Sequence, residues 1–241
     1  MQPVSEMERN MRTAVITGVA QGIGERLASG FSEAGYQVLG MDIQPGEHFQ
    51  GDLSSQTDLD KFVTYIRQET AQVDVLINNA MQPSGGLHQA DYEGFNRTLR
   101  IGVTAPYYLT QQLEALFAPG ASIINILSSR MAQSQAETES YSAAKGGLRA
   151  LTHALMVTLS GKVRVNAIVP GWIDTTGSAF SGADASQHPS GRVGKTDDIL
   201  RAALFLSDPA NSFVNGEELY VDGGISKLMI YHGDGGWTLK S

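Results

Sequence analysis

The sequence predicts an α/β protein in which helices cover both faces of one doubly wound parallel sheet, giving three αβα layers. Short apolar runs alternate along the chain with amphipathic stretches of helical length. Strands that are apolar without interruption are typical of strands buried on both faces. Repeated strand–helix alternation favours parallel pairing with right-handed crossovers. Because no repeat, low-complexity tract or linker divides the 241 residues, we expect a single domain spanning 12–241.

The order of the elements follows from the apolar pattern. We expect strands at 13–17, 37–42, 73–78, 122–128, 164–169 and 218–221, with a weaker run at 48–51. The helical stretches are 22–34, 57–71, 91–117, 139–160 and 196–207. Residues 1–11 are polar and aperiodic and predict a disordered N-terminal tail. Residues 176–191 are rich in small residues and predict a mobile substrate flap.

Composition excludes several functional classes. With 17 basic and 25 acidic residues, the formal net charge is −8, which argues against a nucleic-acid-binding surface. The chain has no cysteine, so disulfides and thiolate chemistry are excluded, and its five histidines lack metal-ligand spacing. No apolar run approaches the roughly 18 residues of a membrane span, and MQPVSEMERN does not resemble a secretory signal. We expect a cytoplasmic protein with a small-molecule partner and no bound metal.

A glycine-rich turn follows the first strand. Residues 17–24 read TGVAQGIG, with the glycines spaced GxxxGxG between a strand and a helix. Such glycines let the backbone approach a pyrophosphate at the helix N-terminus, although a tight turn without a ligand is the alternative. Asp42 ends the second strand, 18 residues beyond Gly24. A carboxylate there accepts from a ribose 2′-hydroxyl and repels a 2′-phosphate. Since Ile43 and Gln21 stand where a cation would meet that phosphate, we expect NAD(H).

Tyr141 and Lys145 are a candidate pair for proton transfer. They stand at i and i+4 on an expected helix, so both project from one face. A nearby ammonium stabilises a phenolate, so the tyrosine can exchange a proton with a carbonyl or an alcohol. By itself YSAAK is also compatible with a solvated helix surface.

Taken together, these motifs resemble the short-chain dehydrogenase/reductase family over residues 12–224. The resemblance rests on TGVAQGIG, the run Asn78-Asn79-Ala80, a serine 13 residues before the YxxxK pair, and a later Pro-Gly. It implies a Rossmann-type fold and a homo-oligomer, commonly a tetramer. It also implies that Ser128 orients the substrate oxygen, with Tyr141 as acid/base and Lys145 on the nicotinamide ribose. Ser129 is the local rival of Ser128 but lacks the spacing.

The candidate cofactor residues combine the glycine turn with positions that the resemblance implies. Asp52 and Leu53 would flank the adenine, Asn79 and Ala80 the adenine-side ribose, and Ile173 and Thr175 the carboxamide. The full set is Gly18, Gln21, Gly22, Ile23, Gly24, Asp42, Asp52, Leu53, Asn79, Ala80, Tyr141, Lys145, Pro170, Gly171, Ile173 and Thr175.

The chain departs from the family pattern at two positions. Gly102 stands where most members carry an asparagine whose main chain holds a relay water, and Met81 replaces the glycine of the NNAG run. We expect catalysis to survive, because glycine keeps the carbonyl, and Met81 to pack against the central helix. Arg130 follows the serine and either recognises an anionic group or is solvated. His188, in the flap, is the histidine most suited to meet substrate.

The sequence therefore predicts an NAD(H)-dependent oxidoreductase that interconverts a secondary alcohol and a ketone. One rival is an NADP(H)-dependent reductase of the 3-oxoacyl type, against which Asp42 argues. The other is a catalytically silent nucleotide-binding scaffold, suggested by Gly102 and Met81. The 17 residues after Gly224 contain an apolar cluster at 228–231, which would cover either the protein's own core or a partner subunit.

Overall fold

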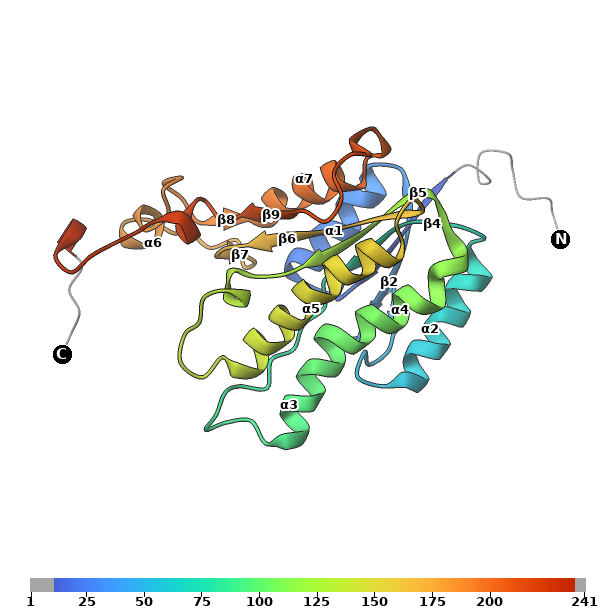
Figure 1. The fold of residues 1–241 in the computed structure, drawn as a ribbon, viewed down its shortest axis with the longest axis horizontal. Coiled ribbons are helices and arrows are strands. Elements are labelled where there is room, and N and C mark those ends of the chain that lie inside the picture. The colour runs from blue at the N-terminus through green and yellow to red at the C-terminus, as the bar shows by residue number, and fades with distance from the viewer. Residues whose placement is uncertain (1–10, 237–241) are drawn as a thin grey trace.

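A seven-stranded parallel sheet forms the centre of the protein in the computed structural model, which describes residues 11–236 (Figure 1). Its strand order is β3-β2-β1-β4-β5-β6-β9. The strands are β1 (Arg12–Thr17), β2 (Tyr36–Asp42), β3 (Phe49–Gln50), β4 (Val73–Asn78), β5 (Phe117–Ile126), β6 (Val163–Pro170) and β9 (Glu218–Val221). The predicted fold class is confirmed. The expected tail at 1–11 lies outside the described residues except for Met11.

Helices cover both faces of this sheet (Figure 1). One face carries α1 (Gly22–Glu33) and α7 (Thr196–Ser207), and the other carries α2 (Gln56–Glu69), α4 (Ala105–Leu113) and α5 (Glu139–Thr158). Helix α3 (Tyr92–Leu99) precedes α4, and the short α6 (Ala183–Ser186) lies within the expected flap. Strands β7 (Ile173–Asp174) and β8 (Gly194–Lys195) pair beyond the main sheet.

Two apolar layers join the helices to the sheet. Phe31 of α1 and Leu206 of α7 are fully buried against one face, and Phe62 of α2 and Leu109 of α4 against the other. Every residue of β6 is buried, as expected for a central strand with helices on both sides. The sheet is thus held rigidly between its helices, and its strand ends are fixed in space.

The strand order reverses between β1 and β4, and this reversal locates the site. After β1, the next two strands along the chain, β2 and β3, lie on one side of it, and β4, β5 and β6 lie on the other side. Loops leaving the carboxyl ends of β1 and β4 therefore diverge and leave a crevice between them, where open α/β sheets bind their ligands. The glycine turn at 17–24 and Asn79 stand at this point.

The long helix expected at 91–117 is present as a continuous stretch of helical backbone, although its winding changes along its length. It consists of α3, a π-helical turn at Arg100–Thr104, α4 and a 3₁₀ turn at Glu114–Leu116, and β5 begins already at Phe117. Pro119 has no backbone N–H, and Gly120 has a φ of +79°, so the chain cannot stay helical here. The register of β5 against β4 shifts between Val73 and Val75 to absorb these residues.

Strand β5 also ends earlier than the expected 122–128. It stops at Ile126, and Ser128 begins a 3₁₀ turn (Ser129–Met131) as its N-cap, accepting from the Arg130 N–H at 3.2 Å. A serine oxygen that caps the following turn competes with strand pairing, which explains the early stop. The other strands and helices agree with the predicted ranges to within two residues.

The C-terminal segment does not cover the core of its own chain. The side chains of residues 228–231 are between 46% and 74% exposed. In Figure 1 this segment extends away from the body of the protein. Among residues 11–236, no helix has the length and apolar character needed to cross a membrane.

Gly30 tests the packing of α1 on α7. A Cβ at Gly30 would lie 2.3 Å from a methyl carbon of Leu200, whereas one at Gly146 of α5 would meet open space. We expect Gly30→Ala to lower the free energy of unfolding by about 1–3 kcal/mol through overpacking. Gly146→Ala, the matched control, should raise it by up to about 1 kcal/mol through helix propensity. Urea unfolding of both variants measures this, and equal effects would contradict the packing.

Candidate active site

The glycine turn makes room for a ligand at the start of α1. Gly18 and Gly22 have φ values of +76° and +62°, a region that favours glycine. A Cβ on Gly24 would lie 1.7 Å from the Gly18 carbonyl oxygen, so no other residue fits there. Gln21 precedes α1 without a side-chain cap on its first N–H groups. Free N–H groups at a helix N-terminus suit a phosphate, so the turn fits a pyrophosphate.

Thr17 and Asn79 tie the ends of β1 and β4 together. The Asn79 side-chain amide donates to the carbonyl oxygens of Thr17 and Gly18, both at 3.0 Å. The Thr17 hydroxyl accepts in turn from the N–H groups of Asn79 and Ala80, at 3.1 and 3.2 Å. Asn79 therefore fixes the shape of the glycine turn, in addition to lining the cavity beside it.

Asp42 and Asp52 place two carboxylates at the glycine-turn end of the cavity. Asp42 is 8% exposed and accepts from the N–H groups of Ala20 and Gln44, at 3.0 and 2.9 Å. Asp52 pairs with Arg97 at 2.8 Å. Burial works to raise the pKa of Asp52, but the hydrogen bonds from Arg97 and Ser54 outweigh it and hold that pKa below its ordinary value.

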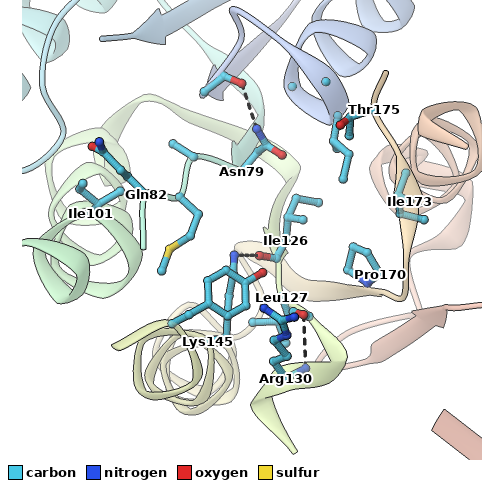
Figure 2. Close-up of a pocket in the computed structure, with 18 of the residues that line it drawn as sticks. Asn79, Gln82, Ile101, Ile126, Leu127, Arg130, Lys145, Pro170, Ile173 and Thr175 are labelled. Atoms are coloured by element: carbon cyan, nitrogen blue, oxygen red, sulfur yellow. Dashed lines mark hydrogen bonds between the residues drawn. The ribbon is translucent and has the colours of Figure 1, made fainter. Parts of the chain in front are cut away.

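Lys145 is the buried cation of the site. It is 2% exposed, and its ammonium donates to the Ile126 carbonyl oxygen at 2.6 Å (Figure 2). Burial lowers its pKa to about 8, since an apolar environment disfavours the charged form. The ammonium lies 5.7 Å from the centroid of the Tyr141 ring, one helical turn away on α5. The predicted pair thus shares one face of α5.

Every predicted site residue lines one cavity of about 1100 Å³. Figure 2 shows Asn79 on one side of it, Pro170, Ile173 and Thr175 on another, and Lys145 and Arg130 on a third. Ser128, Ser129 and Tyr141 belong to the same lining.

The loop after β6 closes the far side. Gly171 approaches the chain so closely that a Cβ there would lie 2.8 Å from the Cα of Asp222. Thr175 reaches back to the glycine turn, because a Cβ on Gly22 would lie 3.2 Å from its methyl carbon. The ends of β1 and β6 are thereby bridged over the cavity.

Met81 packs against Gly102, as predicted from the sequence. A Cβ on Gly102 would lie 3.1 Å from the Met81 sulfur and 2.9 Å from the Cβ of Ala144. Gly102 lies within the π-helical turn between α3 and α4. The thioether therefore fills space that a side chain at 102 would need, so the two departures from the family pattern compensate each other in volume.

His188 neither meets the cavity nor lies in solvent. It is 2% exposed, its Nδ1–H donates to the Asp184 carbonyl oxygen at 3.0 Å, and its ring lies beside Trp172. Sequence reasoning missed several polar lining residues, among them Gln82, Gln133, Ser134, Gln135 and Gln187. These polar loop positions carry no periodic or motif signal. Among residues 11–236, no group of three acidic or histidine side chains could hold a metal ion.

Comparison with known proteins identifies the family. A family model described as enoyl-(acyl carrier protein) reductase matches residues 18–226. An uncharacterized oxidoreductase of Thermotoga maritima is 36% identical, covering 91% of this chain and 98% of its own length. The chain belongs to the short-chain dehydrogenase/reductase family. The predicted resemblance is therefore confirmed.

Two further relatives agree with this membership. A solved apo SCOR enzyme of Clostridium thermocellum superposes with a TM-score of 0.88 at 39% identity, over 96% of this chain and 99% of its own. The cis-4-hydroxycyclohexanecarboxylate dehydrogenase of Sinomonas cyclohexanicum is 32% identical, over 90% of this chain and 97% of its own length. This short-chain dehydrogenase/reductase is accordingly an oxidoreductase of the type that acts on alcohols and ketones, with a nicotinamide nucleotide as cofactor.

The burial of Lys145 gives a pH-dependent contribution to stability. Below pH 8 the lysine is protonated in both states, and the folded protein bears the full cost of burying its charge. Between pH 8 and its ordinary value of 10.5, the unfolded chain binds more protons, so stability rises with pH. Between pH 7 and pH 10, the free energy of unfolding of the wild type should rise by about 2 kcal/mol relative to that of Lys145→Met. Urea unfolding of both proteins measures this, and a constant difference would contradict the burial argument.

Proposed function

We propose that this protein interconverts a secondary alcohol and a ketone with NAD(H), using Ser128, Tyr141 and Lys145. The observation that carries the proposal is the convergence of these three side chains, the glycine turn and Asp42 on one cavity. The name of the Sinomonas cyclohexanicum relative supports the reaction class, because a hydroxyl on a cyclohexane ring is a secondary alcohol.

The glycine turn and the first N–H groups of α1 hold the pyrophosphate, and Asp52, Leu53 and Ala80 border the adenosine. When bound, the nicotinamide supplies the acceptor for a hydride from the alcohol carbon, or the donor in the reverse direction. Ser128 holds the substrate oxygen through its hydroxyl. In oxidation the Tyr141 phenolate takes the proton of the alcohol, and in reduction its phenolic hydroxyl gives a proton to the carbonyl oxygen. Lys145 favours the ionised tyrosine by its charge.

Asp42 carries the preference for NAD(H). Its carboxylate is held at the carboxyl end of β2 by two main-chain N–H groups, so it cannot turn away from the cavity. A ribose 2′-hydroxyl can donate to it, whereas a 2′-phosphate would meet a fixed negative charge. The residues that follow it in the lining, Ile43 and Gln44, bring no cation to this end.

Cofactor titration tests this choice. We expect NADH to bind at least tenfold more tightly than NADPH, and Asp42→Asn to reduce that ratio because the repulsion is removed. Asp74→Asn is the control, since the Asp74 carboxylate binds the Thr13 N–H at 2.8 Å at the opposite end of the sheet. Quenching of protein fluorescence measures both constants. Tighter binding of NADPH by the wild type would instead support the NADP(H)-dependent reductase.

Tyr141→Phe tests the chemistry. The variant keeps the ring and loses the hydroxyl, so turnover should fall at least 1000-fold because proton transfer is lost, while NADH affinity stays within about threefold. Absorbance of NADH across a panel of secondary alcohols and ketones reports turnover. Substantial activity in the variant would remove Tyr141 from its role. Binding of NADH by the wild type without turnover of any compound would favour the silent scaffold.

A further inference from the structure

Arg130 lies at the catalytic end of the cavity. It belongs to the 3₁₀ turn that Ser128 caps, and its own N–H donates to the Ser128 hydroxyl at 3.2 Å. Its guanidinium carbon lies 5.7 Å from the centroid of the Tyr141 ring, and its side chain lines the cavity beside Lys145 (Figure 2). The backbone that positions the serine therefore also positions this arginine, two residues later and next to the tyrosine.

The charges that line the cavity are divided between its two ends. Among the described lining residues, the ionised side chains are Asp42 and Asp52 at the glycine-turn end, and Arg130 and Lys145 at the catalytic end. Lys145 is fully buried and bonded to the Ile126 carbonyl oxygen. Arg130 is half-buried, so among the described lining residues its guanidinium is the more accessible of the two cations at this end.

Arg130 has no carboxylate partner among residues 11–236. Six other arginines there form ion pairs: Arg26, Arg97, Arg100, Arg149, Arg192 and Arg201.

The acids that follow Arg130 in the chain are engaged elsewhere. Glu137 pairs with His88, and Glu139 accepts from the Leu87 N–H at 3.1 Å. The only side-chain hydrogen bond that the described structure gives to the Arg130 guanidinium goes to the neutral Gln135 amide oxygen. Four of its five N–H donors remain for a ligand.

The neighbourhood of Arg130 suits a small polar molecule. Gln133, Ser134 and Gln187 line the same cavity and offer uncharged donors and acceptors. A carboxylate carries one negative charge in a plane that matches the guanidinium fork. A phosphate dianion usually needs more than one exposed cation, and the second cation at this end, Lys145, is only 2% exposed.

We propose that Arg130 binds a carboxylate of the substrate, so that the protein acts on hydroxy acids and the corresponding keto acids. The inference rests on the proposed function and adds the substrate class. The carboxylate bound by Arg130 and the oxygen bound by Ser128 fix two points of one molecule. Two points orient the reacting carbon toward the nicotinamide, which is the main contribution that a protein makes to hydride transfer.

Matched pairs of acid and amide test this substrate class. We would measure kcat/KM with NAD for 3-hydroxybutanoate, 4-hydroxycyclohexanecarboxylate and gluconate, and for the carboxamide of each. Every compound would be assayed with the wild type and with Arg130→Gln. For each acid that is turned over, the wild type should prefer it over its amide at least tenfold. In Arg130→Gln this ratio should fall at least tenfold, because the neutral side chain cannot pair with the carboxylate. The ratio cancels any general damage to the enzyme.

Arg67→Gln is the matched control. Arg67 is exposed on α2, donates to the Gln112 carbonyl oxygen at 2.9 Å and lies outside the cavity lining. The Arg67→Gln substitution removes the same charge as Arg130→Gln. If the acid-to-amide ratio of kcat/KM is unchanged in Arg67→Gln, the effect of Arg130 is a local contact and not a long-range attraction. A ratio that falls equally in both variants would overturn the role of Arg130.

A binding measurement separates this inference from the proposed function. Thermal unfolding of the NADH-saturated protein should shift upward with the acids and less with the amides, and the difference should vanish in Arg130→Gln. If the amides are bound and turned over as well as the acids, Arg130 does not recognise a substrate carboxylate, and the proposed alcohol–ketone reaction is still supported. Tighter binding of glycerol 1-phosphate than of any acid would also overturn carboxylate recognition by Arg130. Arg130-dependent acid binding without turnover would support the inference and contradict the proposed reaction.

Discussion

The close approach of β1 and β4 at the reversal of strand order is the constraint on which the rest of the site depends. Asn79 bonds to two consecutive carbonyl oxygens of the β1 end, and Thr17 returns two hydrogen bonds to the β4 end. Gly24 fits only because it has no side chain, since a Cβ there would also lie 2.6 Å from the Asn79 amide nitrogen. The same contacts that join the ends of β1 and β4 therefore also shape the glycine turn, which is the proposed binding site of the cofactor pyrophosphate.

Tyr141 and Lys145, the proposed catalytic pair, are positioned by a different element, the helix α5. Lys145 anchors α5 to the end of β5 through the Ile126 carbonyl oxygen, and Ser128 lies two residues beyond that carbonyl. One buried hydrogen bond thus sets the spacing between the helix that carries Tyr141 and the loop that carries Ser128. Buried polar contacts of this kind are costly to leave unmade, which makes the arrangement rigid.

The sequence predicted most of what depends on backbone pattern. The strand and helix positions, the parallel sheet, the glycine turn and the i, i+4 spacing of Tyr141 and Lys145 follow from periodicity and spacing, because those signals are local, whereas the order of the strands was not predicted. Three features depend on contacts distant in sequence and could not be predicted. The π-helical turn that contains Gly102 lies against Met81 and Ala144, β5 ends where Ser128 caps the following turn, and His188 is buried beside Trp172. Each is settled by tertiary packing, which a single sequence does not display.

The burial of Lys145 also explains why a ligand belongs at this point of the cavity. An ammonium has three N–H donors, and the described structure assigns one of them to the Ile126 carbonyl oxygen. A group that is 2% exposed has little access to water, so the other donors gain from an acceptor inside the cavity. Hydroxyl oxygens of a bound ribose are acceptors of this kind. Each acceptor that joins the ammonium favours its charged form and counters the burial that lowers its pKa. Under the proposed function, an acceptor from the bound cofactor would therefore keep the lysine charged in the state in which Tyr141 needs a cation beside it.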